Sequence, residues 1–331
     1  MMNRRVFVFR VGALVVAPLA ALAQQPDRIR RIGVLMGLAA TDPVIQPEIA
    51  AFHQGLADLG WRNGTNIKIE YRWGPSDASQ TRRYIRELVE LQSEVIVSRA
   101  TPMTAALARA VKTIPIVFVQ VSDPVGDALV AGMARPGGNV TGFTNVESSM
   151  IGKWLELLKE MSPGIAHVTL LYSPKTSPGG GAYFLRPFEA SAPHFRVRAI
   201  AAAVESDAEI GKAIGAVARE PGGALVVMPG VFVLSRRELI VGLVNQYRIP
   251  AVYPFTFWAN LGGLMSYGTD SPDLFRRAAS YVDRVLKGAK PADLPVQAPV
   301  KFELVINRNA AKVIGLTIPR SLLLRADRVI E

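Results

Sequence analysis

Short, wholly apolar runs alternate with amphipathic segments along most of this 331-residue chain, and this alternation restricts the fold more than any other feature. Residues 32–36 form one such run and precede a helical pattern over 47–59, and residues 95–97 precede another over 102–111. Apolar runs of this length are typical of parallel strands covered on both faces, and the helices between them indicate βαβ units. The sequence therefore predicts an α/β protein with parallel sheets.

The alternation runs through the chain twice, which predicts two α/β halves of similar size. In the first half the expected strands are 32–36, 67–71, 95–97, 116–119 and 140–143, and the expected helices are 47–59, 79–91 and 102–111. In the second half the expected strands are 168–172, 197–203, 224–228, 251–253, 264–267 and 302–306, and the expected helices are 150–161, 183–191, 207–219, 235–247 and 272–286. Glu70 and Arg72 alternate with apolar neighbours, as in an edge strand. Two such lobes would enclose a cleft that closes by a hinge motion.

Residues 1–23 have the parts of a secretory leader. Arginines precede the apolar run 11–20, and the small residues that signal peptidase accepts follow at 21–23. The run is shorter than the roughly 20 residues that a spanning helix needs, which argues against a membrane anchor. We expect cleavage before Gln24 and export to the periplasm, by either the general or the twin-arginine route. The net charge of +11 falls to +8 when the three leader arginines are removed.

Composition and missing motifs argue against most enzyme chemistry. The chain has no cysteine, which excludes disulfides, thiolate catalysis, cysteine-ligated metals and a lipid anchor built on cysteine. The three histidines are far apart in sequence, and no nucleophile elbow, zinc-protease motif or dinucleotide-binding glycine motif occurs. Basic residues are dispersed as singlets and doublets, unlike the concentrated charge of nucleic-acid-binding proteins. We expect no catalytic residue, no cofactor, no metal and no nucleic-acid partner.

The residues that follow each predicted strand are the candidate site, because ligands of open α/β sheets bind beyond the carboxyl ends of the strands. Small residues there let backbone N–H groups approach an anion, and Ser or Thr hydroxyls add hydrogen bonds. Asp123, and second to it Asp270, would pair with a ligand ammonium, and three aromatic residues would form apolar walls. The candidates are Thr41, Ser98, Thr101, Ser122, Asp123, Ser173, Pro229, Tyr253, Phe255, Tyr267 and Asp270.

Each of these candidates also has a purely structural interpretation. Ser98 and Thr101 are residue types that cap helices, with Thr101 as the N-cap before Pro102. Asp123 before Pro124 and Asp270 before a Ser-Pro pair are common helix starts. The aromatic candidates are equally suited to a core. The residue types alone leave both interpretations open.

A set of family-specific motifs is spread over residues 30–331. The most specific of them are Asp-Pro-Val-Gly at 123–126 and Arg-Pro-Gly-Gly-Asn at 135–139. The others are IGVL at 32–35, FHQGL at 52–56, LGW at 59–61, IPIVF at 114–118, GLMSYG at 263–268, LKGAKP at 286–291 and FELVIN at 302–307. With these motifs the chain resembles ABC-transporter substrate-binding proteins of the tryptophan/tyrosine-binding type.

The resemblance implies a type 1 periplasmic-binding fold, in which three strand crossovers join two Rossmann-like lobes. It places the first lobe at residues 24–143 plus 268–292, and the second at 144–267 plus 293–331. It also implies that the candidate residues of the first lobe face those of the second across a ligand. Here Ser98 and Thr101 would hold a carboxylate, Asp123 an amine, and Tyr253 or Phe255 the ligand's side chain.

The same resemblance implies the function and the partners. The protein would capture a small solute, such as an amino acid or a related compound, the aromatic ones included, and deliver it to the membrane subunits of an ABC importer. We expect a monomer. Two alternatives remain open at this point: a sensory binding protein that signals to a membrane receptor, and an enzyme on the same fold.

Overall fold

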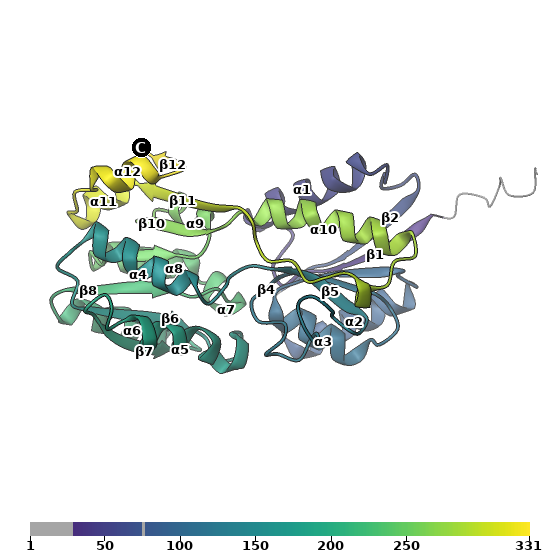
Figure 1. Ribbon diagram of the computed structural model, residues 1–331, viewed down its shortest axis with the longest axis horizontal. Coiled ribbons are helices and arrows are strands. Elements are labelled where there is room, and N and C mark those ends of the chain that lie inside the picture. The colour runs from purple at the N-terminus through teal and green to yellow at the C-terminus, as the bar shows by residue number, and fades with distance from the viewer. Residues whose placement is uncertain (1–28, 75–76) are drawn as a thin grey trace, which may run out of the picture.

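The computed structural model describes residues 29–74 and 77–331, so the predicted leader lies outside the described residues. Two bodies lie side by side along the long axis, each a sheet with helices on both faces (Figure 1). We call the body that contains strands β1 to β5 the first lobe, and the body that contains β6 to β12 the second lobe. The prediction of two α/β halves with parallel sheets is confirmed.

The sheet of the first lobe has five parallel strands in the order β2-β1-β3-β4-β5. Strand β2 lies at the edge, where the alternation of Glu70 and Arg72 with apolar neighbours placed it. The strands are β1 (Arg30–Leu35), β2 (Ile67–Arg72), β3 (Val95–Arg99), β4 (Ile116–Val121) and β5 (Val140–Thr144), and the helices between them are α1 (Ile45–Asp58), α2 (Ala78–Glu90) and α3 (Thr101–Ala110).

The second sheet has the order β12-β11-β10-β9-β8-β6-β7, and all its neighbouring strands are parallel except β10 and β11. Its strands are β6 (His167–Tyr172), β7 (Arg198–Ala203), β8 (Gly223–Val227), β9 (Ala251–Tyr253), β10 (Met265–Thr269), β11 (Phe302–Asn307) and β12 (Arg328–Ile330). The helices that follow β5 are α4 (Met150–Met161), the 3-10 turn η2 (Pro178–Gly181), α5 (Ala182–Ser191), α6 (Asp207–Arg219), α7 (Val231–Leu234), α8 (Arg237–Gln246), α9 (Thr256–Asn260), α10 (Ser271–Leu286), the 3-10 turn η3 (Pro291–Asp293), α11 (Arg308–Ile314) and α12 (Arg320–Arg325).

Helix α10 returns to the first lobe and packs along α1 (Figure 1). The chain stays there through η3, because Thr141 Oγ1 donates to Leu294 O at 2.6 Å and Gln297 N to Gly142 O at 2.9 Å. It then crosses to β11, after earlier crossings that follow β5 and β10. The family resemblance placed residues 293–331 in the second lobe, whereas residues 294–297 lie against β5. The lobe boundaries otherwise stay a prediction.

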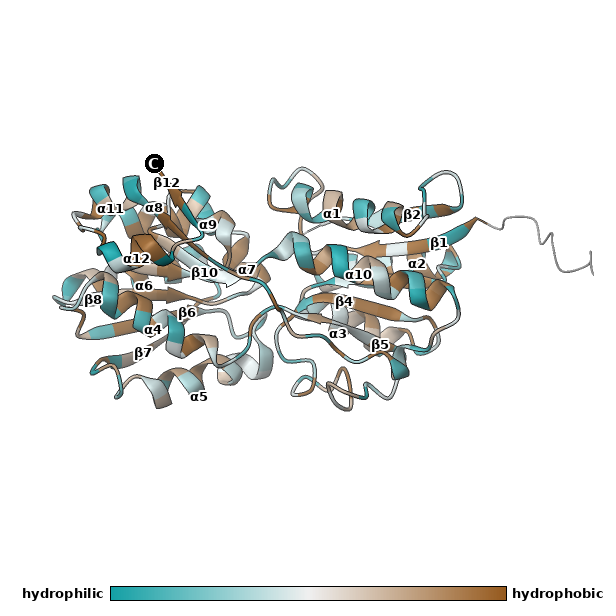
Figure 2. Ribbon diagram, turned by 45° about the horizontal axis from the view of Figure 1, so that its top comes forward, coloured by the Kyte–Doolittle hydropathy of each residue, from teal (hydrophilic) through white to brown (hydrophobic). Residues whose placement is uncertain are grey.

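The cores lie on both faces of each sheet, and the hydropathy colouring shows brown strands between helices with teal outer positions (Figure 2). In the first lobe, one cluster packs Ile32 and Val34 against Phe52 and Phe275 of the helices α1 and α10. A second cluster on the opposite face contains Leu107 of α3. Coverage on both faces explains why the strands are wholly apolar in sequence.

The predicted helix 235–247 is wrong at its start. Helix α7 ends at Leu234, with Ser235 as its C-cap, and Arg236 is the N-cap residue of α8. The hydroxyl of Ser235 donates to Phe232 O at 2.8 Å, back into α7, so it does not cap α8. The break matters because α7 forms a wall of the pocket described next.

Candidate ligand-binding site

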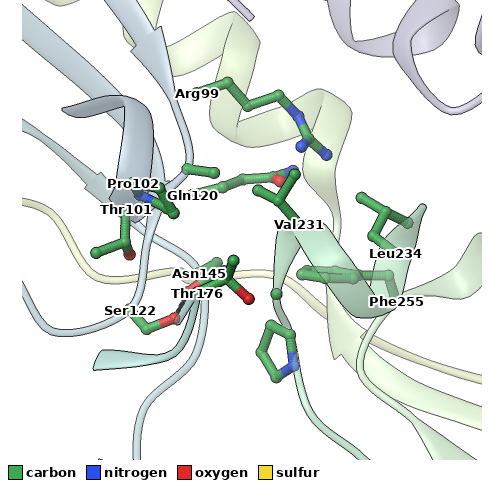
Figure 3. A pocket seen from close by; sticks show the side chains of 13 residues that line it. Arg99, Thr101, Pro102, Gln120, Ser122, Asn145, Thr176, Val231, Leu234 and Phe255 are labelled. Atoms are coloured by element: carbon green, nitrogen blue, oxygen red, sulfur yellow. Dashed lines mark hydrogen bonds between the residues drawn. The ribbon is translucent and has the colours of Figure 1, made fainter. Parts of the chain in front are cut away.

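A pocket lies between the lobes, at the carboxyl ends of β3, β4 and β8 (Figure 3). Its cavity volume is about 30 Å³, which is room for water-sized molecules. A larger solute therefore requires the lobes to separate or the lining side chains to move. The lining residues are Arg99, Ala100, Thr101, Pro102, Gln120, Ser122 and Asn145 on one side, and Thr176, Pro229, Gly230, Val231, Leu234 and Phe255 on the other.

Helix α3 starts at the pocket without a side-chain cap. Its N-cap residue is Ala100, one position before the Thr101 that the sequence indicated, and Ala100 has φ 73°. A non-glycine residue adopts this left-handed conformation at an energetic cost, and such strain concentrates at functional sites. The N–H groups in the first turn have no acceptor within the helix. This end of α3 is thus an electropositive wall of hydrogen-bond donors.

A buried ionic network lies under the same wall. Arg99, at the end of β3, donates from Nε to Glu48 Oε2 at 2.8 Å and from Nη2 to Glu48 Oε1 at 3.2 Å. Gln120, at the end of β4, donates to the same Oε1 at 2.9 Å and has φ 62°. The side chains of Glu48 and Arg99 are 1% and 2% exposed. Glu48 of α1 lies outside the pocket lining and holds the side chains of the lining residues Arg99 and Gln120 in place through these hydrogen bonds.

Three neutral polar residues complete the polar half of the pocket. Ser122 Oγ donates to Asn145 Oδ1 at 2.9 Å, and both side chains are buried. Thr176, from the loop after β6, has a buried hydroxyl oxygen with no hydrogen-bond partner among the described residues. Thr176 and Asn145 both line the pocket drawn in Figure 3. A solute atom in the pocket would give the Thr176 hydroxyl the partner it lacks.

The opposite wall is apolar and comes from the second lobe. Val231 and Leu234 of α7 and Phe255 before α9 line it. Leu234 also packs into the core cluster of the first lobe, so α7 bridges the two bodies. The pocket thus has a polar half and an apolar half, as sites for organic solutes generally do.

Two polar contacts join the lobes beside the pocket. Arg237 of α8 pairs with Asp42 of the β1–α1 loop at 2.9 Å, with side chains 8% and 12% exposed. Gly179 of η2 donates to Asp127 Oδ1 at 3.4 Å. Burial raises the pKa of the Asp127 carboxyl; the hydrogen bond from Gly179 opposes this rise, and the charge of Asp123 adds to it. The lobes are thus in contact across the cleft.

Of the residues predicted for the site, four line this pocket, namely Thr101, Ser122, Pro229 and Phe255. Three others are buried outside the lining. Ser98 shares a hydrogen bond with Thr104 at 2.7 Å, and the carbonyl of Ser173 begins the turn that carries Thr176. Tyr253 stacks on Trp258 in the core, and burial raises the pKa of its hydroxyl.

The remaining four lie away from the lining. Thr41 is exposed, and Tyr267 stacks on Phe302 at a centroid distance of 6.1 Å. Asp270 caps α10 through Asp273 N and pairs with Lys301 at 2.5 Å. Asp123 Oδ1 accepts from Gly126 N at 2.8 Å. None of these four belongs to the pocket lining, and their roles toward a ligand stay predictions.

The sequence-based choice missed the charged and amide residues of the pocket. Arg99 lies between two candidates in sequence, and the missed lining residues also include Gln120, Asn145, Thr176 and Val231. Each of these residues lies at the end of a strand or in the segment that follows it. The sequence-based selection took mainly hydroxyl, carboxylate and aromatic residues at these positions and passed over Arg99, Gln120 and Asn145.

Within residues 29–74 and 77–331, no group of three or more His, Asp or Glu side chains is arranged to hold a metal ion. In the same described ranges, no helix has both the length and the apolar character that a membrane span requires.

Comparison with known proteins gives consistent matches over most of the chain. Residues 39–330 match the family model described as ABC transporter substrate binding protein. The chain is similar to a curated Tyrosine-binding protein of Clostridioides difficile, with 26% identity over 274 residues, 83% of this chain and 78% of the relative.

Two solved structures are similar in both sequence and fold. One is a conserved domain protein from Vibrio cholerae, 28% identical with a TM-score of 0.84. The other is an ABC domain from Streptococcus pneumonia in complex with L-Trp, 30% identical with a TM-score of 0.82. Both similarities cover 91% of this chain and 100% of the other.

Proposed function

This chain belongs to the ABC transporter substrate binding protein family, and we propose that its pocket captures a small carboxylate of amino-acid size with an aromatic side chain. The fold is the type 1 periplasmic-binding fold that its sequence motifs implied. The family's task is solute binding for an ABC transporter, so the partners are a small molecule and transporter membrane subunits. Release of the solute chemically unchanged is part of the proposal.

The observation that carries the proposal is the uncapped start of α3 next to Arg99, opposite an apolar wall. Backbone N–H groups at a helix start and a guanidinium are the donors that carboxylates prefer. Val231, Leu234 and Phe255 would cover the side chain of the solute. The named relatives support an aromatic one, since one is a Tyrosine-binding protein and another holds L-Trp.

Capture follows from the division of the pocket between the lobes. The polar residues of the first lobe bind the carboxylate while the cleft is open, and the apolar residues of α7 and Phe255 contact the solute only after closure. A solute that contacts both walls thereby stabilises the closed form and shifts the population toward it. The transporter would then recognise the closed form.

Export to the periplasm and a monomeric state also belong to the proposal. Members of this family typically act outside the cytoplasm, and the leader over residues 1–23 supports cleavage before Gln24. The mass of the N-terminal peptide of the purified protein tests the cleavage, and sedimentation tests the monomer.

Native mass spectrometry of the chain purified from a periplasm tests the bound solute. We expect a co-purified carboxylic acid of amino-acid size, recovered with the same mass after prolonged incubation. A bound molecule without a carboxyl group, or one that is converted during incubation, would overturn the proposal. Phe255→Ala is expected to weaken retention of the solute, because it removes part of the apolar wall.

A further inference from the structure

We propose that Asp127 binds an ammonium group of the solute, together with the hydroxyl groups of Thr176 and Ser177. The inference deepens the proposed function and rests on it, because it restricts the solute to carboxylates that also carry an amine. Asp127 was not among the site residues that the sequence indicated, and it lies outside the pocket lining.

The first observation is an unsatisfied carboxylate between the lobes. Asp127 lies in the segment after β4 of the first lobe, and its Oδ1 accepts from the Gly179 N–H of η2 in the second lobe at 3.4 Å. Its Oδ2 is buried and has no hydrogen-bond partner among the described residues. A buried carboxylate oxygen is costly unless a donor or a cation satisfies it.

The charges around Asp127 favour a cationic donor. Burial raises the pKa of the Asp127 carboxyl, and the negative charge of Asp123 adds to this rise, while the bond from Gly179 opposes it. Asp123 itself is held in its own turn, where its Oδ1 accepts from Gly126 N at 2.8 Å. Two neighbouring carboxylates without a counter-ion attract a positive group and disfavour a further anion.

The second observation is a pair of unsatisfied hydroxyl groups on the facing loop. The hydroxyl oxygens of Thr176 and Ser177 are buried without a hydrogen-bond partner among the described residues, and Ser177 is 8% exposed. Both residues lie within three positions of Gly179, which contacts Asp127. Thr176 also lines the pocket. This short loop thus connects the pocket with Asp127.

An ammonium group matches these oxygens in number and in charge. It donates three hydrogen bonds and carries the positive charge that the carboxylate lacks. The carboxylate of the same solute would bind at the start of α3, which lines the same pocket as Thr176. Asp127 and α3 both belong to the first lobe, so the two charged groups of the solute would bind there first. Closure would then add the hydroxyls of the second lobe.

Titration calorimetry of the full chain, freed of bound solute, tests the role of Asp127. The ligand pairs are L-tryptophan with indolepropionate and L-tyrosine with hydroxyphenylpropionate, which differ only in the amine. Asp127→Asn keeps the oxygen that accepts from Gly179 and removes the charge. Affinity for the preferred amino acid should fall about tenfold or more, because the ammonium loses its counter-ion. Affinity for its desamino partner should change by less than about threefold.

The matched control is Asp58→Asn, because Asp58 is exposed at the end of α1 and accepts from Gln54 at 2.6 Å. It should leave both affinities unchanged. The inference is overturned if Asp127→Asn binds the amino acid as tightly as the unsubstituted chain, or if both members of a pair lose affinity equally. Failure of the unsubstituted chain to bind either amino acid would also overturn it. The proposed function fails separately, when the molecule recovered from the periplasm has no carboxyl group.

Discussion

Glu48 and Arg99 form an ion pair that is almost completely removed from water, and their bonds also hold Gln120. Removing one charge of such a pair leaves the other buried without a partner. We therefore expect Glu48→Gln to lower the free energy of unfolding by about 3 kcal/mol. The measurement is chemical denaturation.

The control for this change is Glu156→Gln, which weakens the partly exposed pairs of Glu156 with Lys153 at 2.7 Å and with Arg325 at 3.5 Å. Exposed pairs contribute about 1 kcal/mol or less, so the control should lose little stability. Equal stability losses in the two variants would show that burial of the Glu48 pair carries no special energetic role.

Asp123 provides the residue-level test of how the solute is bound. Asp123→Asn keeps the oxygen that accepts from Gly126 N and removes only the charge. If Asp123 pairs with an ammonium of the solute, as the sequence predicts, calorimetric affinity for the solute should fall more than about tenfold. A change of less than about fivefold, the effect of a screened neighbouring charge, would contradict that pairing.

The site residues that the sequence predicted correctly follow from one rule, that ligands bind beyond the carboxyl ends of parallel strands. Residues such as Thr101, Ser122 and Phe255 follow predicted strands, and the carboxyl ends of parallel strands meet at one edge. The rule does not find Glu48, because this residue lies within helix α1 and reaches Arg99 over 51 positions of sequence. Nor does it separate Tyr253, which is core, from Phe255 two residues later.

At the scale of elements, helices α1 and α10 approach each other closely at a glycine. A Cβ at Gly55 would lie 2.8 Å from Arg276 O and 2.9 Å from the Ala279 Cβ. Gly55→Ala is therefore expected to push α10 away from α1 and to destabilise the protein by about 1–3 kcal/mol, despite the better helix propensity of alanine. Thermal or chemical unfolding measures the change.

The control is a helical glycine with open space around it. A Cβ at Gly211 in α6 would meet no heavy atom of the described neighbouring elements within 4 Å. There Gly211→Ala should stabilise the protein by up to about 1 kcal/mol, because only the propensity term acts. Stabilisation by both substitutions would contradict the close packing of α1 on α10.

The predicted elements agree best where amphipathic patterns are long. Helices α4 and α6 begin and end where the sequence pattern placed them. Short elements such as α9, with five residues, and β12, with three, were not predicted, because so few residues show no periodicity. The return of α10 to the first lobe came from the family resemblance, since an amphipathic pattern does not specify which sheet a helix covers.

At the scale of the whole molecule, the ion pair between Asp42 and Arg237 is one of the contacts that join the two lobes. Arg237 Nη1 also donates to Leu234 O at 3.3 Å, so the same side chain ties pocket helix α7 to the first lobe. The pair joins one loop of the first lobe to a helix of the second, and opening of the cleft would separate the two charges. We therefore expect it to favour the closed form in the absence of solute.

Arg237→Met should shift the solute-free protein toward an open form. In the closed form the substitution would leave the Asp42 carboxylate buried without its counter-ion, at a cost of about 3 kcal/mol, whereas in the open form that carboxylate is hydrated. Small-angle X-ray scattering should then show a larger radius of gyration than for the unsubstituted chain. Affinity for the solute should fall as well, because the binding-competent closed form is less populated.

The neighbouring Arg236 offers a matched control, since it pairs at 3.0 Å with Asp207 of its own lobe on the exposed surface. Arg236→Met removes the same charge without breaking an ion pair between the lobes, and its contact with Phe232 stays within the second lobe, so neither the radius of gyration nor the affinity should change. Asp42→Asn should shift the protein toward the open form in the same direction, because Arg237 then keeps an ionic partner only in Glu238 of its own lobe. A radius of gyration equal to that of the unsubstituted chain in both cleft variants would mean that the apolar contacts of α7, rather than this ion pair, keep the lobes together.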